Sequence, residues 1–94
     1  MPLHERELPV PPEAFVDPGA NEVLRTWLVD GGLRIVLYRA FSDPGFWGGV
    51  LADVARNAAE VYEKQGVCTR AEALSRIRAQ FDAAWGDPAA GAAQ

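Results

Sequence analysis

Cysteine, histidine and lysine are scarce in this 94-residue chain: each occurs once, as Cys68, His4 and Lys64. A single cysteine excludes an internal disulfide and a zinc site built on paired thiolates, and it favours a reducing compartment. The single histidine lies in a proline-rich arm, where we expect it to be mobile and solvated rather than held for a triad or a metal centre. The sequence therefore predicts a protein that is not an enzyme and needs no metal or cofactor.

Positive charge and long apolar runs are also in short supply. Nine basic residues face thirteen acidic ones, which gives a formal charge of −4. Affinity for nucleic acid comes largely from Lys and Arg displacing counterions, so an acidic chain is not expected to bind it. No apolar run approaches the roughly 20 residues that cross a bilayer, and the first residues lack the features of a signal peptide. We expect a cytoplasmic protein that binds neither nucleic acid nor membrane.

The composition is that of one small domain, with 49% hydrophobic and 23% charged residues. A chain of this length buries only about 60–70% of its unfolded surface, so its stability must be marginal or shared with a partner. We divide the chain into a proline-rich N-terminal arm (1–16), a single α+β domain (17–86) and a flexible tail (87–94). The last segment has no large side chain to bury.

The arm contains prolines that fix φ and remove amide donors, so it cannot be a central strand. Residues 7–10 could pair weakly at a sheet edge. Asp17-Pro18 has the form of a helix N-cap followed by proline, which predicts a short turn of helix over residues 19–24. Residues 22–29 can also be read as a strand, so the two interpretations compete there.

Two β-rich runs, 25–29 and 33–39, flank Asp30-Gly31-Gly32 and predict a β-hairpin. A two-residue turn at Asp30-Gly31 would pair Leu28 with Leu33 and make one face of the hairpin apolar. A three-residue turn that uses Gly32 would shift the register by one residue and exchange the faces. The sequence leaves both registers open.

The second half predicts two amphipathic helices. In residues 44–65, apolar side chains recur at steps of three and four, and Gly66 is the expected left-handed terminator. Thr69 and Glu72 form a capping box that begins a second helix over 70–85, with its own apolar stripe. The connection between the helices is short enough to make them a hairpin. The stripes consist of Trp47, Val50, Leu51, Val54, Ala58, Val61 and Tyr62, and of Leu74, Ile77, Phe81, Ala84 and Trp85.

The predicted fold class is therefore α+β: a small antiparallel β-hairpin or three-stranded sheet packed against a C-terminal helical hairpin. We expect the two helices to cover the apolar face of the sheet, because neither apolar stripe can remain uncovered.

Residues 43–49 invite comparison with a phosphate-binding loop, since glycines before a helix can expose amides to an anion. The segment lacks the Gly-Lys-Ser/Thr ending and the Gly-x-Gly-x-x-Gly spacing, so a helix cap is favoured. An alternative function is binding of a small molecule or an anion at Asp43 to Gly49, together with Arg25, Arg34 or Arg39. A thiol enzyme around Cys68 ranks last, because no base lies near it in the sequence.

Aromatic and arginine residues favour a protein interface over a catalytic site. The candidate partner-binding residues are Trp27, Arg34, Val36, Phe46 and Trp47. A solvated sheet face is the competing interpretation. The leading function is a small non-catalytic interaction module that self-associates or binds another protein.

A homodimer follows from the exposed edge of the hairpin. Residues 33–38 contain neither lysine nor proline, the residues that usually protect a sheet edge. A two-fold dimer could bury this edge, or the face that carries Trp27, Arg34 and Val36. The alternative is a monomer whose edge is covered by residues 5–12.

Several stretches together resemble a family of small uncharacterised bacterial proteins, about as long as this chain and grouped as a domain of unknown function. These stretches are NEVLR at 21–25, DP at 43–44 with WG at 47–48, LAD at 51–53, and RIR at 76–78 leading to FDA at 81–83 and WG at 85–86. The resemblance covers nearly the whole chain and implies a shared fold. It implies no activity and no functional residues.

Overall fold

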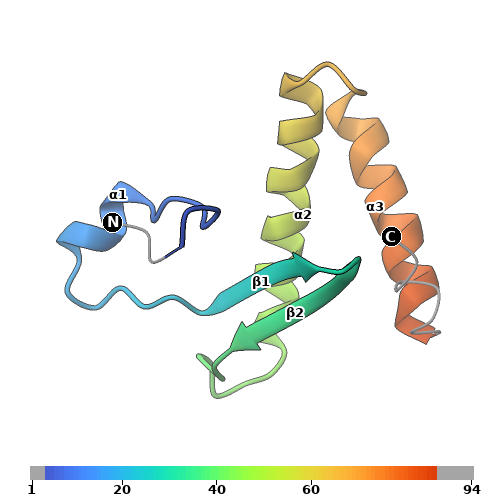
Figure 1. Cartoon of the computed structure of the whole chain (residues 1–94). Coiled ribbons are helices and arrows are strands. Elements are labelled where there is room, and N and C mark those ends of the chain that lie inside the picture. The colour runs from blue at the N-terminus through green and yellow to red at the C-terminus, as the bar shows by residue number, and fades with distance from the viewer. Residues whose placement is uncertain (1–3, 87–94) are drawn as a thin grey trace.

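The structure is a computed structural model that describes residues 4–86, and Figure 1 shows its course. It has an α+β fold, as predicted: a two-stranded antiparallel sheet is followed by a C-terminal helical hairpin. The elements in chain order are α1 (Pro12–Val16), β1 (Leu24–Val29), β2 (Gly32–Leu37), α2 (Phe46–Lys64) and α3 (Arg70–Gly86). The predicted tail, 87–94, lies outside the described residues.

The hairpin between β1 and β2 adopts the register of a two-residue turn. Asp30 and Gly31 have φ values of 51° and 77°, the left-handed conformation that a tight turn between twisted strands requires. Leu28 therefore pairs with Leu33, and Trp27 with Arg34. Because the side-chain period is two, this turn places the leucines on one face and Trp27 and Arg34 on the other.

Both long helices lie close to their predicted positions. Asp43 accepts a hydrogen bond from the Gly45 amide at 2.8 Å and closes a local turn, so α2 begins at Phe46, two residues beyond the predicted start. It is followed by Gly66 in the left-handed conformation, with φ of 72°. The capping box of α3 is confirmed: the Glu72 amide donates to Thr69 Oγ1 at 3.1 Å, and Thr69 Oγ1 donates to Glu72 Oε1 at 2.9 Å.

The short N-terminal helix was predicted in the wrong place. Asp17 accepts a hydrogen bond from the Gly19 amide at 2.8 Å and forms a turn, and residues 19–24 are not helical. The helix instead begins at Pro12, whose fixed φ suits the first helical position. Residues 7–10 form no strand, so among the described residues the sheet is two-stranded rather than three-stranded.

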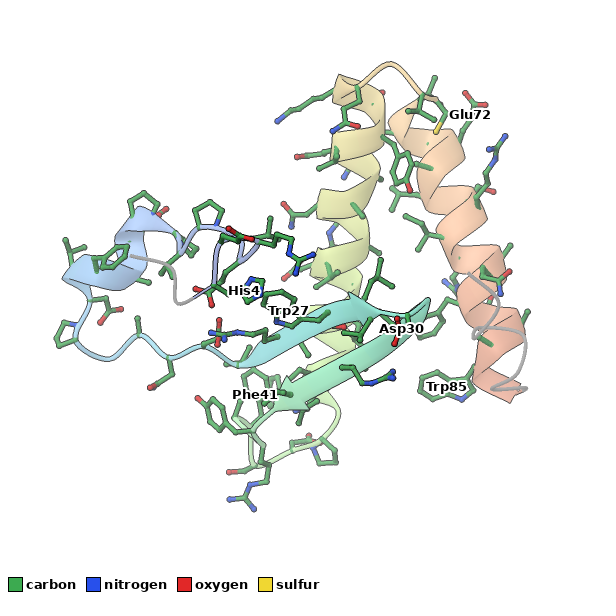
Figure 2. All side chains as sticks on the ribbon, in the orientation of Figure 1. His4, Trp27, Asp30, Phe41, Glu72 and Trp85 are labelled. Carbon is green, nitrogen blue, oxygen red and sulfur yellow. The ribbon has the colours of Figure 1, made fainter. Side chains whose placement is uncertain are left out.

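The arm nevertheless contacts the sheet through side chains. The His4 ring meets the Trp27 ring edge-on, with 4.9 Å between centroids, and Glu7 lies 3.4 Å from Arg25 in an ion pair. Figure 2 shows His4 beside Trp27. His4 is exposed, as expected, and its ring also packs against an aromatic neighbour that lies far away in the sequence, a contact that the sequence did not indicate.

The interior of a single chain is very small. Among residues 4–86, the buried hydrophobic residues are Ala59 and Ala73, which are 0% and 4% exposed. They lie on α2 and α3 respectively, near the connection from which the two helices splay apart (Figure 1). The large side chains of the predicted stripes are left half-buried or exposed.

The prediction that the two helices cover the apolar face of the hairpin is wrong. Four of its side chains are each more than half exposed, namely Leu28, Leu33, Ile35 and Leu37. The main link between the sheet and α2 is the segment after β2, where Trp47 Nε1 donates to the Arg39 carbonyl at 3.0 Å. The pattern correctly marked these side chains as apolar, but it did not show that a single chain leaves them open to solvent.

The overall dimensions show the same openness. The radius of gyration is 15.2 Å, whereas a compact chain of this length has about 12 Å. The accessible surface is 7979 Å², whereas folded monomers of this mass expose roughly 5,300 Å². Among the described residues, no helix is both long enough and apolar enough to cross a bilayer.

Candidate interaction surface

An open groove of about 850 Å³ lies between α2 and α3. It exists because the two helices are in contact near their connection and diverge toward the start of α2 and the end of α3 (Figure 1). Most of its lining side chains are apolar. The groove is lined by Pro44, Gly45, Trp47, Gly48, Leu51, Ala52, Ala55, Arg56, Leu74, Ile77, Arg78, Phe81, Asp82 and Trp85.

The α3 wall of this groove carries the larger side chains. Leu74 and Ile77 are half-buried, whereas Phe81 is more exposed and Trp85 is 77% exposed. The rings of Phe81 and Trp85 stack at a tilt, with 5.4 Å between centroids. An indole this exposed is unusual for a residue in the apolar stripe of a helix, because such a side chain normally drives burial.

The α2 wall has small residues where a neighbour can approach closely. A Cβ atom added at Gly48 would meet no atom within 4 Å outside its own helix backbone and chain neighbours. Ala52 and Ala55 follow on the same wall. The groove therefore has a projecting ring at one side and open space at the other.

The charged residues at the groove are engaged within their own helices. The Arg78 guanidinium donates from Nε to both carboxylate oxygens of Asp82, at 3.0 and 3.1 Å. Arg56 forms an ion pair with Asp53. These pairs follow helical spacing, so each arginine is paired with a carboxylate on its own helix.

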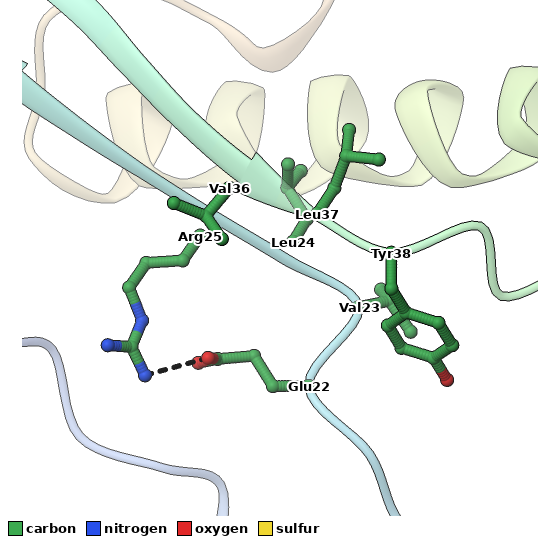
Figure 3. A pocket seen from close by; sticks show the side chains of 7 residues that line it. All are labelled: Glu22, Val23, Leu24, Arg25, Val36, Leu37 and Tyr38. Carbon is green, nitrogen blue, oxygen red and sulfur yellow. Dashed lines mark hydrogen bonds and ion pairs between the residues drawn. The ribbon is translucent and has the colours of Figure 1, made fainter.

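The predicted partner-binding residues fall into two separate places. Trp27, Arg34 and Val36 share one face of the sheet, as the observed register requires. Val36 is 69% exposed, whereas Trp27 is partly covered by His4. A shallow depression of about 290 Å³ lies nearby, and in it Arg25 is bound to Glu22 at 2.7 Å (Figure 3).

Phe46 and Trp47 lie instead at the start of α2. Their rings contact Phe41 with centroid separations of 5.9 and 5.8 Å, which anchors the segment after β2 on the helix. Phe46 is 63% exposed, and Trp47 also lines the groove. Of the predicted set, Trp47 is therefore the residue that lines the groove between α2 and α3.

The remaining apolar residues of the groove were missed as candidates. Leu51, Leu74, Ile77, Phe81 and Trp85 all appeared in the predicted stripes. Their helical spacing was the available signal, and it was assigned entirely to an internal core. Spacing shows that a face is apolar, but it does not show which chain covers it.

The Asp43 to Gly49 segment is less suited to bind an anion than its glycines suggested. The Asp43 carboxylate accepts the Gly45 amide, so a negative charge already sits at this helix entrance. Arg25, one of the proposed anion-binding residues, pairs with Glu22 and Glu7. Cys68 is a free, half-buried thiol, and no metal-binding cluster occurs within residues 4–86.

One carboxyl group has a clearly perturbed acidity. Hydrogen bonds from the hydroxyl and then the amide of Thr69 lower the pKa of Glu72 below its usual value of 4.5. Glu72 lies in the first turn of α3, where these bonds cap the helix. This perturbation has a structural cause and does not mark a catalytic acid.

Comparison with known proteins identifies relatives of the whole fold. A family model described as a domain of unknown function (DUF5076) matches residues 7–89. A solved structure from the photosynthetic bacterium Rhodopseudomonas palustrus CGA009 is 43% identical, with a TM-score of 0.71, and the match covers 86% of this chain and 83% of that one. That protein is provisionally described as a pyruvate dehydrogenase. The search among curated proteins gave no match.

Proposed function

The chain belongs to the DUF5076 family, and we propose that it acts as a non-catalytic interaction module whose working unit is a homodimer. The observation that carries this proposal is the small interior of one chain: two alanines are the buried hydrophobic residues within 4–86. Hydrophobic burial is the main favourable contribution to folding. A chain that leaves its large apolar side chains uncovered needs a second surface to stabilise it.

The amount of excess surface is appropriate for an obligate interface. The chain exposes 7979 Å², about 2,700 Å² more than expected for a folded monomer of its mass. Obligate homodimers bury roughly 2,000–5,000 Å² or more in total, which is half of that per chain. This excess, which counts all 94 residues, is of the same order as the surface that each chain buries in such an interface, and two-fold homodimers are the commonest closed assemblies.

The alternative function, an anion or small-molecule site at Asp43 to Gly49, has weaker support. An anion there would have to approach the Asp43 carboxylate, which lies 2.8 Å from the Gly45 amide. Like charges disfavour such binding. The apolar groove between α2 and α3, by contrast, has the composition of an interface core.

Light scattering coupled to size exclusion tests the proposal. We expect a mass of twice 10.2 kDa at micromolar concentration, maintained on tenfold dilution. A constant mass of 10.2 kDa across that range would refute self-association.

A further inference from the structure

We propose that the groove between α2 and α3 is itself the dimer interface, and that Trp85 of each chain enters the open space beside Gly48 of the other. This inference rests on the proposed self-association and specifies its surface. In such a dimer, α2 and α3 of both copies would form a four-helix arrangement around a two-fold axis. The sheet would remain outside it.

Self-complementarity is the first argument for a second copy as the occupant. In a two-fold interface the same patch is used by both chains, so any projection on the patch must find its recess on that same patch. Trp85 projects, being 77% exposed, and Gly48 leaves open space where an added Cβ would meet nothing within 4 Å. Both residues line the same groove.

The small residues of α2 provide the second argument. Helices pack at axial separations of about 8–10 Å, and small side chains at the contact permit the closer values. Gly48, Ala52 and Ala55 leave room on this wall for an aromatic ring or a helix of the partner. Within one chain, nothing among residues 4–86 occupies that room.

The charge distribution is compatible with contact between identical patches. A patch that meets itself must not carry one sign of charge, because like charges placed opposite each other repel. The charged residues of the groove, Arg56, Arg78 and Asp82, include both signs. Arg78 and Asp82 are hydrogen-bonded to each other within α3, so neither brings an unpaired charge to the interface.

A matched pair of glycine variants tests the recess directly. Gly48 and Gly49 are adjacent in α2, and a Cβ added at either meets nothing within 4 Å. Leucine favours the helix at both positions. Only Gly48 lines the groove, so Gly48→Leu fills the space meant for the partner and Gly49→Leu does not.

We expect Gly48→Leu to raise the dimer dissociation constant by about 100-fold or more, because overpacking occurs twice across a two-fold axis. Gly49→Leu should leave it within about threefold of the original value, as for a residue outside the interface. Sedimentation equilibrium measures both constants, and circular dichroism checks that both variants remain helical. Equal effects of the two variants would overturn the assignment of the groove.

A second pair of variants distinguishes the groove from the sheet. We expect Trp85→Ala to weaken the dimer by about 30-fold or more, as for a central aromatic anchor. Ile35→Ala, on the apolar sheet face, should leave association nearly unchanged. The reverse result would assign the dimer to the sheet, overturning the groove while preserving self-association.

Fluorescence quenching of tryptophan in the unmodified protein distinguishes the remaining outcomes. A dimer whose Trp85 is shielded from an aqueous fluorescence quencher, relative to the Gly48→Leu variant, supports the groove. Because Trp27 and Trp47 also fluoresce, their signal is measured in a Trp85→Phe variant and subtracted, at a protein concentration where light scattering shows that the variant has the same mass as the protein it is compared with. A monomer would refute both self-association and this interface. A monomer with Trp85 shielded would show that the chain fills its own groove.

Discussion

At the scale of single residues, the hydrogen bonds of the α3 capping box should make the stability of the protein depend on pH. Hydrogen bonds from Thr69 lower the pKa of Glu72. The ionised Glu72 carboxylate therefore stabilises the fold above about pH 4.5, and this stabilisation is lost as pH falls through the lowered pKa. We expect Thr69→Ala to raise the pKa of Glu72 toward 4.5. It should also lower Tm more at neutral pH than in acid, where Glu72 is protonated in both proteins. NMR titration of the Glu72 carboxyl carbon measures the pKa.

The control for this variant is Thr69→Ser, which keeps the hydroxyl that donates to Glu72. It should retain the lowered pKa. A Glu72 pKa that is the same in the alanine and serine variants would contradict the assigned cause.

At the scale of elements, the hairpin depends on left-handed backbone at its turn. Gly31 has φ of 77°, a conformation that an L side chain adopts at a cost of about 1–2 kcal/mol. We expect Gly31→Ala to reduce the free energy of unfolding by about that amount. Chemical denaturation at a fixed protein concentration provides the measurement.

Gly32→Ala is the matched control in the same turn. Its added Cβ would lie 3.0 Å from Nη1 of Arg34, the far end of a flexible side chain that can move aside. It should therefore cost clearly less than Gly31→Ala. If both variants cost the same, backbone conformation is not the reason for the glycine at position 31.

At the scale of the whole molecule, folding and association should be coupled. Because one chain has so small an interior, the folded state of the proposed dimer would gain much of its burial from the partner, and mass action would then make Tm depend on concentration. We expect a tenfold increase in protein concentration to raise Tm by about 4 °C, from the unfolding enthalpy typical of a dimer of this size. Differential scanning calorimetry over a concentration series measures the shift. A Tm independent of concentration would contradict the coupling.

Features that depend on neighbours a few residues apart could be predicted from the amino-acid sequence. The capping box at Thr69 and Glu72, the terminator Gly66 and the ends of α2 and α3 all rest on local hydrogen bonds or on a left-handed residue. Asp30-Gly31 located the hairpin turn for the same reason. The family resemblance, carried by short stretches along the chain, was confirmed by the match to residues 7–89.

The three-dimensional structure alone shows how these elements use their apolar faces. It selected the two-residue turn and hence the two faces of the hairpin, placed α1 at Pro12, and set His4 against Trp27. It also showed that α2 and α3 bury alanines near their connection and diverge elsewhere, so that Phe81 and Trp85 line an open groove. The physical reason is that periodicity records where apolar side chains lie on an element, whereas the partner of that face is set by packing between distant segments.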